Sequence, residues 1–304
     1  MNQKEKRRHL FRVFLKSKAL FACFSIVLSF LLIVGSTYAW ITSADQRLNR
    51  TETNRRKLSA RIDEDFNQVF HLAPGTTQTK AVRVKNDGET PAIVRLSFKE
   101  FFVGFEVDTN DNHRLDANLL NGNANLTLHE LDEQNDTLID IKDTSTWAVG
   151  NVYSVDGTNH YIANNNVQNH TYDLNEVRTE PLSAFQLNFQ TAKVFDDPDD
   201  TVGEENYWFY HEGFFYYSEV LQSNDDPLTP QTENLTVDLL ESITLDASYA
   251  NQYKGALYKL VPEMDAHDIT ESILTDWGIA GSPVEDIYKD HLVFMSKSNQ
   301  GGGG

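Results

Sequence analysis

The residues best suited to bind a metal lie in the polar stretch DTNDNHRLD, residues 108–116. Asp108, Asn110 and Asn112 stand at alternate positions, as the oxygen ligands of calcium loops do, and Asp116 adds a second carboxylate. An EF-hand loop also needs a glycine at its sixth position and a glutamate at its twelfth, and this stretch has neither. We therefore expect either a weak calcium site or an ordinary solvated loop here, and no other cofactor.

Two histidine–glutamate pairs, His129-Glu130 and His211-Glu212, match the first two residues of a zinc-hydrolase motif. That motif, HExxH, places two histidines one helical turn apart so that both reach the same zinc ion. Neither pair has a second histidine at that spacing, and both lie in strand-like sequence. The chain also shows no nucleophile–histidine–acid pattern and no phosphate-binding glycine loop, so we expect a protein that is not an enzyme. A zinc site assembled from residues distant in the sequence is the open alternative.

The densest aromatic cluster is NYWFYHEGFFYY, residues 206–217. Such a cluster can form a surface that stacks against sugar rings. It fits better as two strands of a hairpin that turns near Glu212-Gly213. One face of the hairpin would then lie in the core and the other against a neighbouring element or subunit.

The first 39 residues have the layout of an export signal. Seven basic residues and one acidic residue precede the uncharged run ALFACFSIVLSFLLIV, residues 19–34. Small residues follow the run, with Thr37 at −3 and Ala39 at −1 of a cut before Trp40. We therefore predict a signal peptide, residues 1–39, and a secreted protein. Counted through Ile41, the run is also long enough to span a bilayer, so an uncut membrane anchor is the alternative.

Charge and cysteine content limit the classes of partner and of fold. Removing residues 1–39 leaves 19 basic and 44 acidic side chains, a net charge of −25. A chain this acidic disfavours nucleic acid and suits divalent cations or basic partners. The single cysteine, Cys23, lies in the removed segment, so the secreted chain has no disulfide and depends on its core. The remaining 265 residues suffice for one large or two small domains.

Residues 57–295 are dominated by short apolar runs with a period of two. The alternation covers residues 58–62, 82–85, 92–99, 185–189 and 235–245, with Gly, Pro, Asn and Asp between the runs. Such runs indicate half-buried antiparallel strands. Many strands without helical patterns between them predict an all-β fold, a jelly-roll β-sandwich.

Four segments depart from this pattern. Residues 40–56 are polar and form an N-terminal arm and connector, and residues 296–304 are expected to be a disordered tail. Residues 104–180 are rich in Asn and Asp and are interpreted as an insertion of short strands and loops on the sandwich. Residues 263–277 place Ile269, Ile273 and Trp277 four apart, which predicts a short C-terminal helix ended by Gly278. 

Several short motifs follow one another in an order that resembles a known family. The junction TYAWI, residues 37–41, is similar to sites cut by SipW-type signal peptidases. The block HLAPGTTQTKAVRVKNDGETPAIVRLSF, and later EGFFYYSEVL, LLESITLD and DWGI, resemble the BsaA branch of the TasA/camelysin family of biofilm matrix proteins. The specificity of these motifs comes from their order and spacing, and residues 104–180 match none of them.

This resemblance implies a jelly-roll subunit that is processed by a SipW-type signal peptidase and secreted into the biofilm matrix. In TasA-like proteins the N-terminal segment of the mature chain adds as a strand to the sheet of the next subunit, which builds a fibre. Here that donor strand is Trp40 to Leu48, with Trp40 and Ile41 as apolar anchors. The implied partners are further copies of the chain and other matrix proteins.

Two other functions stay open at this point. Camelysin-like relatives are described as metallopeptidases, but this chain lacks the HExxH that such an activity leads us to expect. An uncleaved signal would instead make the protein a membrane-anchored surface adhesin.

Overall fold

The computed structural model describes residues 58–64, 73–108, 125–223, 233–249 and 252–300. The chain divides into two compact units, residues 1–55 and 56–304, and every described residue belongs to the second. None of the helices in this described part has the length and hydrophobicity that crossing a bilayer requires.

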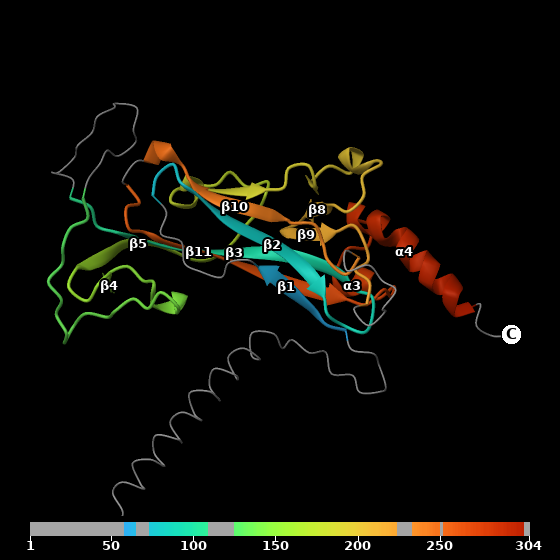
Figure 1. Ribbon diagram of the computed structural model, residues 1–304, viewed down its shortest axis with the longest axis horizontal. Helices are drawn as coiled ribbons and strands as arrows, with labels where there is room; N and C mark the ends of the chain where they lie inside the picture. Colours follow the sequence, from blue (N-terminus) through green and yellow to red (C-terminus); the bar gives the residue numbers. More distant parts are fainter. Residues whose placement is uncertain (1–57, 65–72, 109–124, 224–232, 250–251, 301–304) are drawn as a thin grey trace, which may run out of the picture. The chain divides into compact units, whose positions relative to one another are not determined.

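Two β-sheets form the framework of the second unit (Figure 1). The four-stranded sheet has the order β1 (Ala60–Glu64), β2 (Thr77–Asn86), β10 (Leu240–Leu245) and β6 (Phe185–Phe189). All three of its pairings are antiparallel, and β10 carries a bulge between Leu240 and Ser242. The strands of this sheet are those that the period-two runs predict.

The second sheet is built around the long strand β3 (Ile93–Phe105). On one side β3 pairs along most of its length with β11 (Leu257–His267). On its other side it pairs with β5 (His160–Thr171) and β9 (Phe214–Tyr217). The remaining members are β4 (Val152–Ser154) beyond β5, and β8 (Trp208–His211) and β7 (Val194–Phe195) beyond β9.

The main hydrophobic core lies between the inward faces of the two sheets. Strand β3 directs every second side chain into it, and the four-stranded sheet contributes residues such as Val82, Val84 and Ile243. Phe98 packs edge-on against both Phe189 and Phe215. The predicted all-β sandwich is confirmed. Among the described residues, four short 3-10 helices lie in its loops: η1 (Thr144–Thr146), η2 (Leu182–Ala184), η3 (Pro198–Thr201) and η4 (Ala247–Tyr249).

The region 104–180 is less separate from the sandwich than an insertion would be. Its strand β5 pairs with β3 and is therefore an integral member of the second sheet. The segment before β5 packs the buried Trp147 into a small cluster with Val103 and Phe105 of β3 and Leu257 of β11. The indole N–H of Trp147 donates to the carbonyl oxygen of Asp140 at 3.0 Å. The polar residues of β5 hide its alternation, because only Ala163 among its twelve residues is buried.

The C-terminal region corrects two predictions. Residues 263–267 belong to β11, and the predicted helix is reduced to one turn, α3 (Ile273–Asp276), followed by Gly278 in the left-handed region. A longer helix, α4 (Pro283–Gln300), was not predicted, and it includes residues 296–300 of the expected disordered tail. In Figure 1, α4 and β4 lie at opposite ends of the second sheet.

The aromatic run forms the predicted hairpin. Strands β8 and β9 pair antiparallel and turn at Glu212 and Gly213, whose φ angles of 47° and 85° suit a tight two-residue turn. Trp208, Tyr210 and Phe215 face the main core. The opposite face packs against α3 and α4 in a second cluster, so the predicted neighbour is the C-terminal helical segment.

Candidate functional site

The predicted signal and arm residues lie outside the described part of the chain. This applies to the cleavage residues Thr37, Ala39 and Trp40, and to Ile41 and Leu48 of the donor strand.

Only one of the calcium candidates is described. The backbone N–H of Asp108 donates to the carbonyl oxygen of Asn125 at 2.6 Å, which extends the pairing beyond the end of β3. Asn110, Asn112 and Asp116 lie outside the described residues. Within the described part of the chain, no group of three or more acidic, histidine or cysteine side chains is arranged to hold a metal ion.

The two histidine–glutamate pairs have different surroundings. His129 Nε2 lies 2.9 Å from Asp136 Oδ2 in a polar turn. The backbone N–H of Asp132 and the His129 side chain both stabilise the Asp136 carboxylate, and they lower its pKa. His211 ends β8 at the hairpin turn. The pairs therefore occupy unrelated parts of the fold, a turn and a hairpin.

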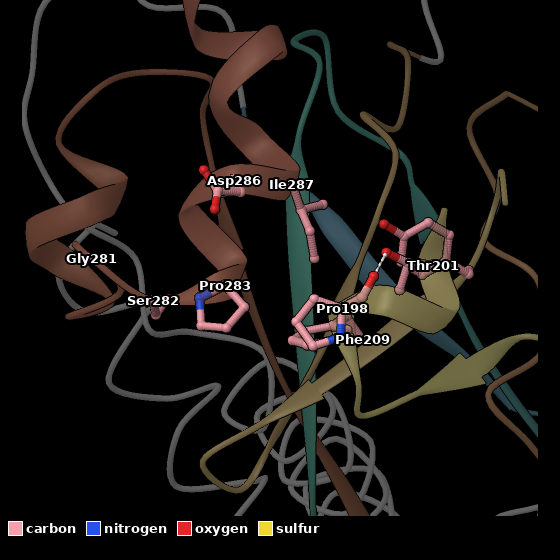
Figure 2. Close-up of a pocket in the computed structure, with 9 residues that line it drawn as sticks. Pro198, Thr201, Phe209, Gly281, Ser282, Pro283, Asp286 and Ile287 are labelled. Atoms are coloured by element: carbon pink, nitrogen blue, oxygen red, sulfur yellow. Dashed lines mark hydrogen bonds between the residues drawn. The ribbon is translucent and has the colours of Figure 1, made fainter. Parts of the chain in front are cut away.

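A cavity of about 460 Å³ lies between η3 and the start of α4. Figure 2 shows Ser282, Pro283 and Asp286 facing Pro198 and Phe209 across it. Its hydroxyl groups are already engaged: Thr201 donates to the carbonyl oxygen of Pro198 at 2.7 Å, and Ser282 donates to that of Ile279 at 2.7 Å. Both of these hydrogen bonds run to backbone carbonyl oxygens, so neither hydroxyl donates to a basic side chain.

A buried ionic cluster lies deeper in the sandwich, around Glu100 of β3. Its side chain is fully buried, and Tyr258 donates to its Oε1 at 2.6 Å. Arg178 donates to the same oxygen and also to the carbonyl oxygen of Phe185. Burial raises the pKa of Glu100, and the charge of Arg178 opposes that rise. His170 Nε2 lies 4.0 Å from the other carboxylate oxygen.

The cluster ties a loop to the sandwich. Arg178 belongs to the segment between β5 and η2, which Tyr210 also holds by donating to Asp173 Oδ1 at 2.6 Å. Sequence reasoning missed the cluster, although a signal existed: Glu100 stands in the inward register of Leu96, Phe98 and Phe102. A charge at such a position indicates a buried partner.

Five strands lie at the margins of the two sheets within the described part of the chain. Strands β1 and β6 end the order of the four-stranded sheet, β4 and β7 end the order of the seven-stranded sheet, and β11 pairs only with β3. An open edge presents backbone N–H and C=O groups that can pair with another strand. The sequence signal for an edge in β11 is Pro262, because proline is confined to edges or bulges of sheets.

In comparisons with known proteins, no family model, curated protein sequence or solved structure matches this chain.

Proposed function

We propose that this chain is a secreted structural subunit of extracellular biofilm matrix fibres. Assembly occurs when the N-terminal arm of one copy adds as a strand to a sheet of the next copy. The observation that carries the proposal is the β-sandwich with open strand edges, because strand addition requires an acceptor edge.

The position of the first strand supports this assembly. The arm, residues 40–56, precedes β1, and β1 is itself an edge strand. The chain therefore enters the sandwich at its margin, where an arm can extend towards another copy without crossing a packed sheet. Before cleavage, the apolar run of residues 19–34 would hold the arm at the membrane. Cleavage before Trp40 would release it, which confines assembly to the exported protein.

Such assembly is head-to-tail. The arm and the acceptor edge are different surfaces, so each added copy leaves one arm and one edge available at the ends of the chain of subunits. An association of this kind does not close unless its rotation forms a ring, and it produces fibres.

Electron microscopy of two purified proteins tests the function. The chain that begins at Trp40 is expected to form fibres, and the chain that begins at Arg50, which lacks the donor strand, is expected to stay monomeric. Circular dichroism of both proteins checks that the sandwich is folded. Monomers from both proteins, each correctly folded, would contradict assembly through the arm.

A further inference from the structure

We infer that β11 is the edge that receives the arm, and that its occupant is residues 40–48 of a second copy. This inference rests on the proposed function and identifies the surface that the function uses. It follows from the direction of backbone groups, the length of the open edges, the partly buried side chains beside β11 and the distribution of charge.

The backbone of β3 shows which groups of β11 point outward. The carbonyl oxygen of Phe98 accepts from Tyr172 N–H at 2.9 Å, and Ala92 exchanges two backbone hydrogen bonds of 2.9 Å with Leu221. Both partners lie on the side of β3 opposite β11. Backbone groups alternate in direction along a strand, so the N–H and C=O groups of the even-numbered residues of β3 point away from β11. The N–H and C=O groups of the residues that stand opposite them on β11 consequently point away from β3.

The residues of β11 whose backbone groups face outward include Leu260, Pro262, Met264 and Ala266, which stand opposite even-numbered residues of β3. Pro262 has no N–H, but here its nitrogen faces away from β3, so the ladder between β3 and β11 loses no hydrogen bond. The N–H groups of Leu260, Met264 and Ala266 make no backbone hydrogen bond within the described part of the chain. An incoming strand can therefore form backbone hydrogen bonds with β11 before and after Pro262, and it loses only the one bond that an N–H at position 262 would have donated.

Length distinguishes β11 from the other four strands at sheet margins, β1, β4, β6 and β7. At about 3.3 Å per residue, a nine-residue donor strand extends for roughly 30 Å. Leu257 and Tyr258 at the start of β11 are fully buried, which leaves the nine residues 259–267 as an edge of roughly 30 Å. The five residues of β1 or of β6 span roughly 16 Å, and β4 and β7 are shorter still. The edge of β6 is also partly covered, since the carbonyl oxygen of Phe185 accepts from Arg178. Only β11 matches the length of the arm.

Apolar side chains with remaining exposure lie beside this edge. Met264 and Ala266 of β11 and Ala60 and Ile62 of β1 are only partly buried and pack against the main core. Strands β1 and β11 lie close to each other, so these residues border the same margin of the sandwich.

The arm has apolar residues in a suitable register for this margin. Trp40, Ala44 and Leu48 have the same parity and therefore share one face of an extended strand. Paired with β11, that face would lie over the partly buried margin, and its side chains would extend the main core.

Charge complementarity favours the arm as the occupant. Residues 40–57 carry five basic and two acidic side chains, a net charge of +3. Residues 58–304 carry 14 basic and 42 acidic side chains, a net charge of −28. The acids include Glu263, which is exposed on the outer face of β11, whereas the carboxylate of Asp265 is paired with Arg95 of β3 at 3.0 Å. The arm is thus a basic segment on an acidic chain, and the acidic body of a second copy attracts it.

A matched pair of alanine-to-proline substitutions tests the edge. Ala266→Pro removes an outward N–H from β11, and Ala60→Pro removes one from β1. Ala60 stands opposite Asn86, and the N–H of Asn86 donates to Asn234 on the far side of β2, so the N–H of Ala60 also points away from the β1–β2 pair. Both changes are made in the chain that begins at Trp40, and circular dichroism confirms folding. We expect Ala266→Pro to lose fibres in electron micrographs and Ala60→Pro to keep them.

The outcomes separate the two proposals. If the unmodified chain forms no fibres, the proposed function fails. If it forms fibres and folded Ala266→Pro forms them equally well, the function stands and β11 is not the acceptor. Loss of fibres in Ala60→Pro alone would move the acceptor to β1 and overturn the inference.

Cross-linking gives a second test that does not depend on proline. The chain that begins at Trp40 has no cysteine, so single cysteines can be introduced cleanly. A Ser43→Cys variant is mixed with a Glu263→Cys variant and treated with a short bismaleimide. Because each molecule has one cysteine, a cross-link joins two copies. Peptides that link residues 43 and 263 are expected.

Glu241→Cys is the matched control, since Glu241 is exposed on β10, which is paired on both sides. Equal linking of residue 43 to positions 241 and 263 would overturn the inference. A double variant that carries both Ser43→Cys and Glu263→Cys gives a further check. If residues 43 and 263 are linked only within one molecule of this variant, the arm occupies its own edge and the inference is overturned.

Discussion

Glu100 is a carboxylate in the interior of a β-sandwich, and Arg178, 78 positions later in the chain, balances its charge. Taking both groups out of water costs free energy, which their attraction offsets only while the pair is intact. Removing one partner leaves an uncompensated buried charge. The cluster is therefore more sensitive to the loss of one residue than its few contacts suggest.

We predict that Arg178→Met lowers the free energy of unfolding by about 3 kcal/mol at neutral pH. The variant keeps an apolar side chain of similar length but leaves the Glu100 carboxylate without its principal counter-charge. Urea denaturation of the wild type and the variant measures the difference. Double substitution to Glu100→Gln and Arg178→Met should recover part of the loss, and no recovery would show that packing of Arg178, not its charge, is responsible.

The same pair gives a pH dependence with a definite sign. Because the pKa of Glu100 is raised above its ordinary value of 4.5, the native state keeps this proton at pH values where the unfolded chain has lost it. The contribution of Glu100 to stability is therefore largest below that ordinary value and falls as the pH rises through the raised one. Loss of Arg178 raises this pKa further. The loss in the free energy of unfolding caused by Arg178→Met should therefore be smaller at about pH 5 than at about pH 7. An equal loss at both pH values would contradict this explanation.

At the scale of elements, α4 anchors the aromatic hairpin. Tyr288 of α4 is fully buried, and its hydroxyl donates to the carbonyl oxygen of Tyr217 at 2.9 Å. Val284 and Ile273 are buried in the same cluster, so the helical segment covers the hairpin face that points away from the main core. Without this cover, a row of aromatic side chains would be exposed to solvent.

We predict that Tyr288→Ala lowers the free energy of unfolding by roughly 3 kcal/mol or more, through the lost apolar contacts and the cavity left behind. Tyr288→Phe should cost about 1 kcal/mol, because it removes only the hydrogen bond. Lys289→Ala is the control on the same helix, since that side chain is 68% exposed and should change stability by less than about 0.5 kcal/mol. Equal urea midpoints for Tyr288→Ala and Lys289→Ala would show that α4 does not support the sandwich.

The elements differ in how far the sequence predicts them, for physical reasons. Strands such as β2 have one face in the core and one in solvent, so their period of two is visible. Strand β5 has few apolar residues because most of its side chains are not buried, and its pairing with β3 is set by tertiary structure. The start of α4 had a signal that was missed, with Ser282 before Pro283 and an apolar spacing from Val284 to Tyr288.

The candidate site was predictable to a smaller extent. Parity alone places Glu100 inside the sandwich, but nothing local indicates Arg178 as its partner, because the two meet only when the loop after β5 closes. Pro262 indicates an edge strand, whereas the length of that edge depends on the continuous register between β11 and β3. Long-range contacts of this kind are fixed by the assembled core, not by local pattern.

At the scale of the whole molecule, two electrostatic effects would oppose each other during the proposed assembly. The basic arm would attract the acidic body of the next copy, while subunits that begin at Trp40, with a net charge of −25, would repel one another. In the proposed contact the attraction would act over a few ångströms, between groups that lose part of their hydration. The repulsion acts between all the surface charges of two subunits, over distances that depend on the salt concentration.

Screening decides which effect limits assembly. The Debye length is about 30 Å at 0.01 M salt and about 8 Å at 0.15 M, so moderate salt suppresses the repulsion between subunits far more than the short-range contact of the arm. We therefore predict that the fibre yield of the chain beginning at Trp40 rises between these salt concentrations, and rises again at mildly acid pH as surface carboxylates gain protons. Sedimentation of fibres measures the yield, with the chain beginning at Arg50 as the control for non-specific precipitation. An unchanged yield would show that repulsion is not limiting, and a lower yield in salt would mean that the attraction of the arm dominates assembly.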